Sequence, residues 1–182
     1  VDLGFNPIVP FLQKQIKSIS SAESIEELYK KSVEHVADVT DFDRIMLYQF
    51  KQDESGEVVA EKKKPEVDKF FGMCFPASNI PKQARVLYVR NISRIILDSE
   101  SKGIKFVPPS LKIDLSMCHL RAVSEIHLEY LRNMGVKSSF SISIVIEGKL
   151  WGLIACHNLT KKNLPLKQRL LLELLGENLS LE

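Results

Sequence analysis

The stretch that decides the fold is SSFSISIVIEGKLWGLIACHN, residues 138–158 of a 182-residue chain. Its first half alternates apolar residues with serines: Phe140, Ile142, Ile144 and Ile146 against Ser139, Ser141 and Ser143. A period of two is typical of a half-buried strand, here with one face lined by hydroxyl groups. Glu147-Gly148-Lys149 predicts a turn into a partner strand over residues 150–157, so the stretch predicts an antiparallel hairpin.

A second hairpin is predicted closer to the N-terminus. The segment Phe42–Phe50, FDRIMLYQF, is rich in aromatic and branched residues that favour strands. Gly56 precedes a second strand near residues 57–61. The lysines at 62–64 predict a solvated basic turn, and residues 101–112 predict a loop.

Helices are predicted around these strands. One begins at Ser20-Ser21, a hydroxyl cap followed by acids, and runs to about residue 38. Another covers residues 79–90, with Asn79 as its cap and Pro81 in its first turn. Two more cover residues 124–133, ended by Gly135, and the leucine-rich residues 166–181. The order predicts an α+β fold, with an antiparallel sheet of about five or six strands and helices packed on it.

Composition bounds the class of protein. The chain is 45% apolar and has no repeat or low-complexity linker, so a single domain over residues 1–182 is expected. Its 25 basic and 23 acidic residues are too balanced for nucleic acid or an anionic membrane to be the main partner. No apolar run is long enough to cross a bilayer, and no secretory signal is visible at the start. The three cysteines show neither disulfide nor metal-site spacing, so a cytoplasmic location and no metal are expected.

Cys118-His119 is the first candidate for chemistry. It is either a nucleophilic thiol beside an imidazole, as in a cysteine-dependent enzyme, or a buried cysteine beside a surface histidine. His127 lies on a predicted helix and His157 at a strand end, and each is either a ligand or a core histidine. Cys74 and Cys156 have apolar neighbours and are expected in the core.

Several blocks of this sequence together resemble the bilin-binding GAF domains of phytochromes. CHLRAVSEIHLEYLRNMGV (118–136) is similar to their bilin-attachment segment. The resemblance continues in DRIMLYQF (43–50), FPASNIPKQARVLYVRN (75–91), SSFSISIVIEGKLWGLIACHN (138–158) and the terminal LELLGENLSLE. The blocks cover most of the chain in the family's order, which implies the GAF fold.

The resemblance implies a role for each matching residue. Cys118 matches the cysteine that forms a thioether with the A-ring of a linear tetrapyrrole, and His119 is its usual neighbour. His127 matches the histidine near the pyrrole nitrogens, and His157 the one that hydrogen-bonds the D-ring carbonyl. The other implied contacts are aromatic residues around the D-ring (Tyr48, Phe75, Tyr130), arginines near the propionates (Arg94, Arg121), polar propionate-side groups (Tyr88, Ser139, Ser141) and the turn Asn79-Ile80-Pro81, whose backbone carbonyl accepts from the pyrrole N–H groups.

The implied function is a red/far-red photoreceptor domain, not an enzyme, that signals by isomerisation of the C15=C16 double bond. Its output module, such as a histidine kinase, would lie elsewhere in a larger sensor. Phycocyanobilin is favoured because a GAF cysteine resembles its binders; phytochromobilin and biliverdin are alternatives, and biliverdin usually attaches through a cysteine upstream of the domain. The alternative function is a GAF module that binds a cyclic nucleotide or another small ligand without light sensing.

Two positions depart from the family pattern. Asn79 replaces the family's aspartate, which removes a carboxylate that couples protonation to photoconversion, and Glu125 replaces a proline. One surface feature also bears on partners. The last predicted helix carries an apolar stripe that either joins a homodimer or covers the sheet: Leu170, Leu171, Leu174 and Leu181.

Overall fold

The computed structural model describes residues 8–108 and 110–181. The elements follow in the order α1 (Ile8–Ser20), α2 (Ile25–Thr40), β1 (Arg44–Phe50), β2 (Gly56–Lys63), β3 (Cys74–Phe75), the 3₁₀ helix η1 (Ala77–Asn79), α3 (Lys82–Arg90), β4 (Ser93–Ile96), α4 (Glu125–Asn133), β5 (Ser138–Ile146), β6 (Lys149–Asn158) and α5 (Leu166–Leu179). The strands form one antiparallel sheet in the order β3-β2-β1-β6-β5-β4. The predicted α+β fold and both predicted hairpins are confirmed.

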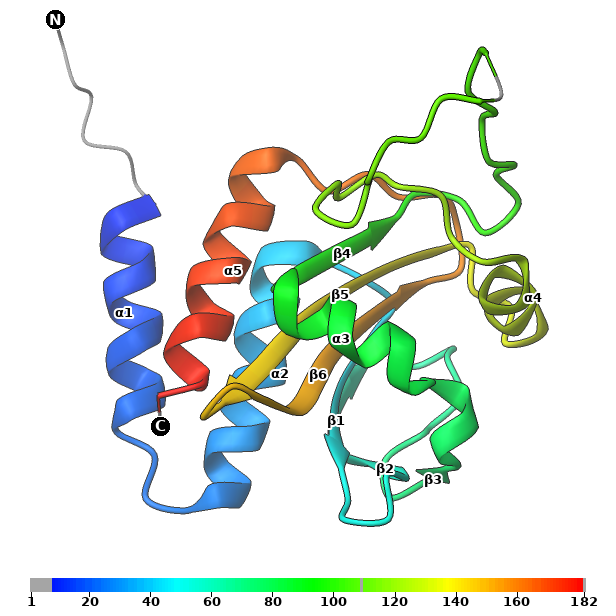
Figure 1. Ribbon diagram of the computed structural model, residues 1–182. Coiled ribbons are helices and arrows are strands. Elements are labelled where there is room, and N and C mark those ends of the chain that lie inside the picture. Colours follow the sequence, from blue (N-terminus) through cyan, green and yellow to red (C-terminus); the bar gives the residue numbers. More distant parts are fainter. Residues whose placement is uncertain (1–7, 109, 182) are drawn as a thin grey trace, which may run out of the picture.

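The sheet separates two different layers (Figure 1). Helices α2 and α5 cover one face, with α1 packed against both of them, whereas α3 and α4 lie on the other face. Phe140, Ile142 and Ile154 point toward the three-helix layer and are each 0% exposed. The serines of β5 point to the opposite face because side chains alternate along a strand. Ser139 and Ser141 are buried too. The prediction of a half-buried strand was therefore wrong, since α3, α4 and the loop before α4 cover the serine face.

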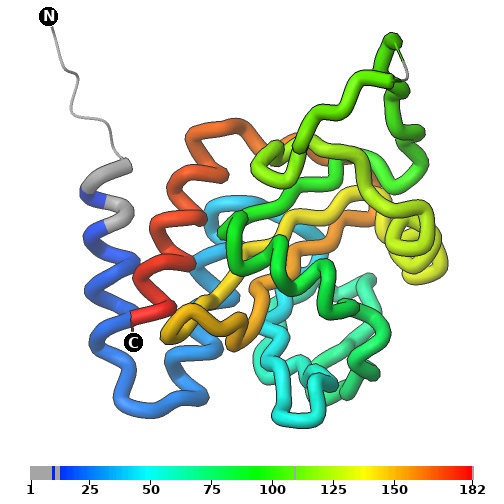
Figure 2. The backbone as a smooth tube through the Cα atoms, viewed as in Figure 1, coloured from blue at the N-terminus to red at the C-terminus, as the bar shows by residue number. Residues whose placement is uncertain are grey.

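The start of α2 differs from the prediction. Ser20 ends α1, a helix that the sequence analysis missed and that lies beside α5 (Figure 2). The cap of α2 is Ser24, whose Oγ accepts from the Glu27 N–H at 3.1 Å. The Glu27 carboxylate in turn accepts from the Glu23 N–H at 2.8 Å, which makes a reciprocal capping box. Residues 1–7, where no secretory signal was predicted, lie outside the described residues.

Asn79 does not cap α3, contrary to the prediction. It ends η1, and Pro81 stands at the N-cap of α3 with extended backbone. A proline suits a helix start because it lacks an N–H group that would otherwise stay unpaired. The short strands β3 and β4 were not predicted, because two and four residues are too few to show alternation.

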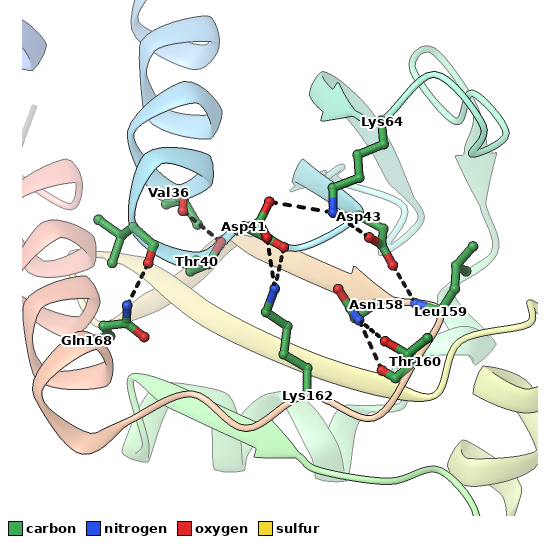
Figure 3. A network of polar contacts seen from close by, with 11 residues as sticks. Val36, Thr40, Asp41, Asp43, Lys64, Asn158, Leu159, Thr160, Lys162 and Gln168 are labelled. Atoms are coloured by element: carbon green, nitrogen blue, oxygen red, sulfur yellow. Dashed lines mark hydrogen bonds and ion pairs between the residues drawn. The ribbon is translucent and has the colours of Figure 1, made fainter.

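A polar network ties the end of α2 and the start of β1 to the segment after β6 (Figure 3). Lys162 binds the carbonyl and the carboxylate of Asp41, the left-handed residue that ends α2. Lys64 pairs with Asp43 at 2.9 Å, and the other Asp43 oxygen accepts from the Leu159 N–H at 2.8 Å. These contacts hold the start of β1 against the end of β6. Strands β1 and β6 supply one wall of the site described below.

Some predictions about single side chains need correction. Lys62 and Lys63 end β2, so only the neighbourhood of Lys64 is a turn. Cys74 is exposed because it lies on the two-residue edge strand β3, whereas Cys156 is buried in the core as predicted.

The predicted leucine stripe of α5 is divided between two faces of the helix, because residues 170 and 171 lie about 100° apart on a helix. Leu171 is buried, whereas Leu170, Leu174 and Leu181 are exposed.

In the part of the chain described, no helix combines the length and the apolar character that a membrane crossing requires.

Candidate functional site

A cleft lies on the serine face of the sheet, beneath α3 and α4. It consists of two adjoining cavities, with volumes of about 520 Å³ and about 80 Å³. The residues that border both cavities are Asn79, Ile80, Tyr88, His127 and Tyr130. The cavities are therefore parts of one elongated space, of a size that suits a cofactor rather than an ion.

Aromatic side chains line much of the smaller cavity, which we call the inner end of the cleft. Tyr48 from β1 and Phe75 from β3 have ring centroids 6.1 Å apart, and the Phe70 ring lies 6.0 Å from that of Phe75. The pairing of β1 with β2 shifts register between Leu47 and Tyr48, because β2 has an extra residue, Val59, at this bulge. Burial and the neighbouring Tyr130 raise the pKa of Tyr48 to about 12, so its hydroxyl stays protonated at neutral pH.

His157 places its imidazole ring at the inner end of the cleft. It lies on β6, is 8% exposed, and its Nδ1 has no hydrogen-bond partner among the described residues. Burial, followed by the charges of Arg44 and His127, lowers the pKa of His157 to about 3. The imidazole is therefore neutral at pH 7 and can donate one hydrogen bond and accept another.

Helix α4 supplies the middle of the cleft. His127 and Tyr130, three residues apart on one helix face, stack with ring centroids 6.1 Å apart and an interplanar angle of 25°. The Asn79 amide donates to the Tyr130 hydroxyl at 3.3 Å, which joins η1 to α4 across the cleft. Burial and the charge of Arg94 lower the pKa of His127, so this imidazole also favours the neutral form.

Two arginines border the larger cavity. The Arg94 guanidinium donates to the carbonyls of His119 at 2.8 Å and Arg121 at 2.5 Å, and Arg121 Nη1 donates to the Cys118 carbonyl at 3.1 Å. Burial and the charge of Arg121 lower the pKa of Arg94 to about 10, which leaves Arg94 charged at pH 7. Two neighbouring cations at one cavity wall favour an anionic ligand group.

Most of the predicted site residues border the two cavities: Tyr48, Phe75, Asn79, Ile80, Pro81, Tyr88, Arg94, Arg121, His127, Tyr130, Ser139, Ser141 and His157. Cys118 and His119 border neither cavity and are exposed. Cys74 and Cys156 border neither cavity either. The structure therefore assembles the predicted noncovalent site but does not bring the predicted thioether cysteine into it.

The sequence analysis missed several apolar residues of the cleft. Met46, Leu153 and Ala155 border the smaller cavity, and strand alternation could have placed them on the same face as Tyr48 and His157. Phe70 also borders it but lies in a loop, where no periodic pattern marks a side chain as inward-pointing.

Comparison with known proteins identifies the family. The GAF domain family matches residues 24–182. The chain belongs to the GAF domain family. This GAF domain is 39% identical over 170 residues to a bacteriophytochrome of Pseudomonas aeruginosa, covering 91% of this chain and 23% of the relative. It is 37% identical over 179 residues to cyanobacterial phytochrome A of a Nostoc species, covering 92% of this chain and 23% of the relative. This GAF domain therefore spans about a quarter of the length of these curated relatives.

Solved structures agree with this assignment. The GAF domain matches the chromophore-binding domain of a Stigmatella aurantiaca bacteriophytochrome with a TM-score of 0.91 at 38% identity, over 98% of this chain and 60% of that chain. It matches the chromophore-binding domain of an unusual bacteriophytochrome from R. palustris with a TM-score of 0.92 at 38% identity, over 97% of this chain and 60% of that chain. The predicted GAF fold and the resemblance to phytochromes are confirmed.

Proposed function

We propose that this GAF domain binds a linear tetrapyrrole in the cleft and is the light-sensing domain of a larger photoreceptor. The observation that carries the proposal is the order of chemical groups along the cleft. Aromatic rings and the neutral His157 form the inner end, His127 and Tyr130 the middle, and the two arginines the outer wall. A bilin is a long apolar molecule with two carboxylates and several N–H donors, which matches this order. Its phytochrome relatives support the same assignment.

Each part of the cleft then has a task. The His157 imidazole would donate to the D-ring carbonyl, and Arg94 and Arg121 would bind the propionates. A backbone carbonyl of the turn at Asn79 would accept from the pyrrole N–H groups. Light would isomerise the C15=C16 double bond and rotate the D-ring against Tyr48, Phe75 and Tyr130. The repacking would pass to an output module such as a histidine kinase in the full-length protein, in a cytoplasmic sensor.

Covalent attachment at Cys118 is a separate prediction, and the thiol lies next to Arg94 at the wall of the larger cavity. The exposed thiol would have to move into the cavity while Arg121 and Arg94 hold the backbone at Cys118 and His119. We infer that noncovalent contacts suffice for binding here. The pigment proposed first is still phycocyanobilin, with phytochromobilin and biliverdin as the alternatives.

The thioether question has a direct test. Biliverdin and phycocyanobilin are each mixed with wild type and with Cys118→Ser, and zinc-induced fluorescence is recorded on a denaturing gel. Both proteins should bind pigment in solution and lose it on denaturation. A covalent adduct in wild type that disappears in Cys118→Ser would restore the thioether at Cys118.

Binding itself is tested by titrating pigment-free protein with biliverdin and recording red absorbance. A saturable red band at one pigment per chain is expected. Ala155→Leu, which fills the smaller cavity, should weaken binding at least about fivefold, because overpacking a tight site costs roughly 1–3 kcal/mol. The matched control is Ala22→Leu, in the turn between α1 and α2, which should bind normally. No red band, together with saturable binding of cyclic AMP or cyclic GMP, would favour the alternative small-ligand function.

A further inference from the structure

A buried ion pair flanks the inner end of the cleft and has no part in the contacts proposed above. Arg44 begins β1 and Glu61 lies on β2; both side chains are 4% exposed, and Arg44 Nε lies 3.5 Å from Glu61 Oε1. Burying two charges is costly, and apolar residues of similar volume often give equal or greater stability. The pair therefore calls for an explanation other than stability.

The contacts of the pair converge on Phe70. Arg44 Nη2 donates to the Asp68 carbonyl at 2.7 Å, and the guanidinium carbon lies 3.7 Å from the centroid of the Phe70 ring. The Glu61 carboxylate accepts from the Phe70 N–H at 3.0 and 3.1 Å and from the Phe71 N–H at 3.1 Å. Arg44 thus holds the ring of Phe70 while Glu61 holds its backbone. Because Phe70 borders the smaller cavity, the pair fixes part of the cavity wall.

Arg44 also faces His157. The two residues are directly opposite in the antiparallel pairing of β1 with β6, where opposed side chains lie on the same face of the sheet. Alternation along β1 places Arg44 on the same face as Met46 and Tyr48, which both border the cavity. A permanent positive charge therefore lies beside the imidazole that ends the cleft.

We propose that Arg44 is a positioning residue for the bilin site, held by Glu61 so that it fixes the Phe70 ring and keeps a positive charge beside His157. The imidazole then meets the pigment in its neutral form and in one orientation. This inference rests on the proposed bilin function, but its first test requires no pigment.

Several other polar groups face the inner end of the cleft and are the same in wild type and in the Arg44 variants. They are Tyr48 on β1, Tyr88 on α3, His127 and Tyr130 on α4, and Ser139, which is opposite His157 on β5. His127 is the further group whose charge lowers the pKa of His157. Asp68 lies near Arg44, and it is the Asp68 backbone carbonyl that accepts the hydrogen bond from the Arg44 guanidinium. Substituting Arg44 therefore changes the field at His157 mainly by removing one cation and leaving the Glu61 carboxylate.

The first experiment follows the His157 imidazole by NMR as a function of pH in the pigment-free protein. Arg44→Met should raise the titration midpoint of His157 by about 1 pH unit, the size expected for one nearby charge. Arg44→Lys keeps a cation and should leave the midpoint close to wild type. The matched control is Lys137→Met, which breaks the exposed pair between Lys137 and Glu100 and should change nothing. An unchanged midpoint in folded Arg44→Met would overturn the proposal.

Two further variants keep the test decisive if Arg44→Met does not fold. The double variant Arg44→Met/Glu61→Gln removes both charges and so avoids an unpaired buried carboxylate. It should fold and still show a raised midpoint for His157. Glu61→Gln alone removes the anion but keeps the cation, so its midpoint should not rise. A raised midpoint in Glu61→Gln, or an unchanged one in the double variant, would contradict the role given to Arg44.

The second experiment records the absorption spectrum of the bilin-loaded variants. Arg44→Lys keeps the charge but loses the planar guanidinium on Phe70, so its red band should shift and broaden while binding persists. An unchanged spectrum would contradict the positioning of Phe70. If wild type binds no bilin, the proposed function fails, whereas the pigment-free titration of His157 still decides the role of Arg44.

Discussion

The ring of Tyr48 occupies the space that a side chain at Gly56 would need: a Cβ atom on Gly56 would lie 2.0 Å from Tyr48 Cζ. Gly56 begins β2 and pairs with Phe50, two residues beyond Tyr48 on β1. On β6, a Cβ atom on Gly152 would lie 2.5 Å from the Tyr48 carbonyl oxygen. Glycines on both neighbouring strands therefore give Tyr48 the room to border the cleft.

Gly56→Ala should displace the Tyr48 ring into the smaller cavity. We expect a loss of roughly 1–3 kcal/mol in the free energy of unfolding, because an added methyl group overpacks the site. The bilin-loaded variant should also show a shifted red band, since Tyr48 borders the cavity. Chemical denaturation and absorbance measure the two effects. Wild-type stability and spectrum in Gly56→Ala would show that the ring is free to move.

Asn79→Asp should increase the fraction of pigment that photoconverts under saturating red light. Asn79 donates to the Tyr130 hydroxyl but supplies no charge, whereas a carboxylate would stabilise the protonated pigment and link its proton to the photoproduct. We expect wild type to convert incompletely and to fluoresce more than the variant. Difference spectra and fluorescence yield check this. If wild type converts completely and Asn79→Asp changes nothing, Asn79 has no effect on photoconversion and serves only to contact Tyr130.

Acid should destabilise the pigment-free domain through His157. The folded-state pKa of His157 is lowered from 6.5 to about 3. Above pH 6.5 both states are neutral and the residue contributes no pH dependence. As the pH falls from 6.5 toward 3, the unfolded chain binds a proton that the folded chain does not. Stability should then fall by about 1.4 kcal/mol per pH unit from this residue.

His157→Gln removes this contribution, so its stability should fall less steeply between pH 6.5 and 5 in urea titrations. Part of the slope should remain, because burial also lowers the pKa of His35 and His127. Equal slopes in wild type and His157→Gln would mean that the folded protein accepts a proton at His157.

The outward leucines of α5 should hold two copies of the domain together. Leu170 and Leu174 are each 49% exposed and lie four residues apart on one helix face. We expect light scattering at high concentration to give twice the 20.7 kDa mass of the chain, and Leu170→Lys/Leu174→Lys to give the monomer mass. Ile25→Lys, which changes a 51% exposed apolar residue at the start of α2, is the control. If the wild-type domain has the monomer mass at high concentration, Leu170 and Leu174 do not form a dimer interface.

Periodic and motif-based features were predictable from the sequence, and features set by tertiary contacts were not. The alternation in β5 and the hairpin of β1 with β2 were both correct. The second buried face of β5 was missed, because only the fold brings Tyr88 of α3 and His127 of α4 to the cavity that Ser139 and Ser141 also border. The family resemblance located most of the cleft residues. It did not show that the Cys118 thiol is exposed and outside the two cavities, because adjacency in a motif does not fix the direction of a side chain in a loop.

The role of Arg44 could not have been predicted, because its contacts join residues far apart in the sequence. Arg44 meets Asp68 and Phe70 across 24 and more positions, and His157 across a strand pairing. No local pattern distinguishes such an arginine from one in solvent. Its burial beside a carboxylate appears only once β1, β2 and β6 are paired.

The most direct test of the central claim is the difference spectrum of the bilin-loaded domain before and after saturating red light. A pigment held in the cleft, with a D-ring that rotates against Tyr48, Phe75 and Tyr130, predicts partial loss of the red band. A new band should appear and revert in darkness or under far-red light. A domain that binds bilin stoichiometrically but shows no light-induced change, in wild type and in Asn79→Asp alike, would contradict the claim that the cleft is a light sensor.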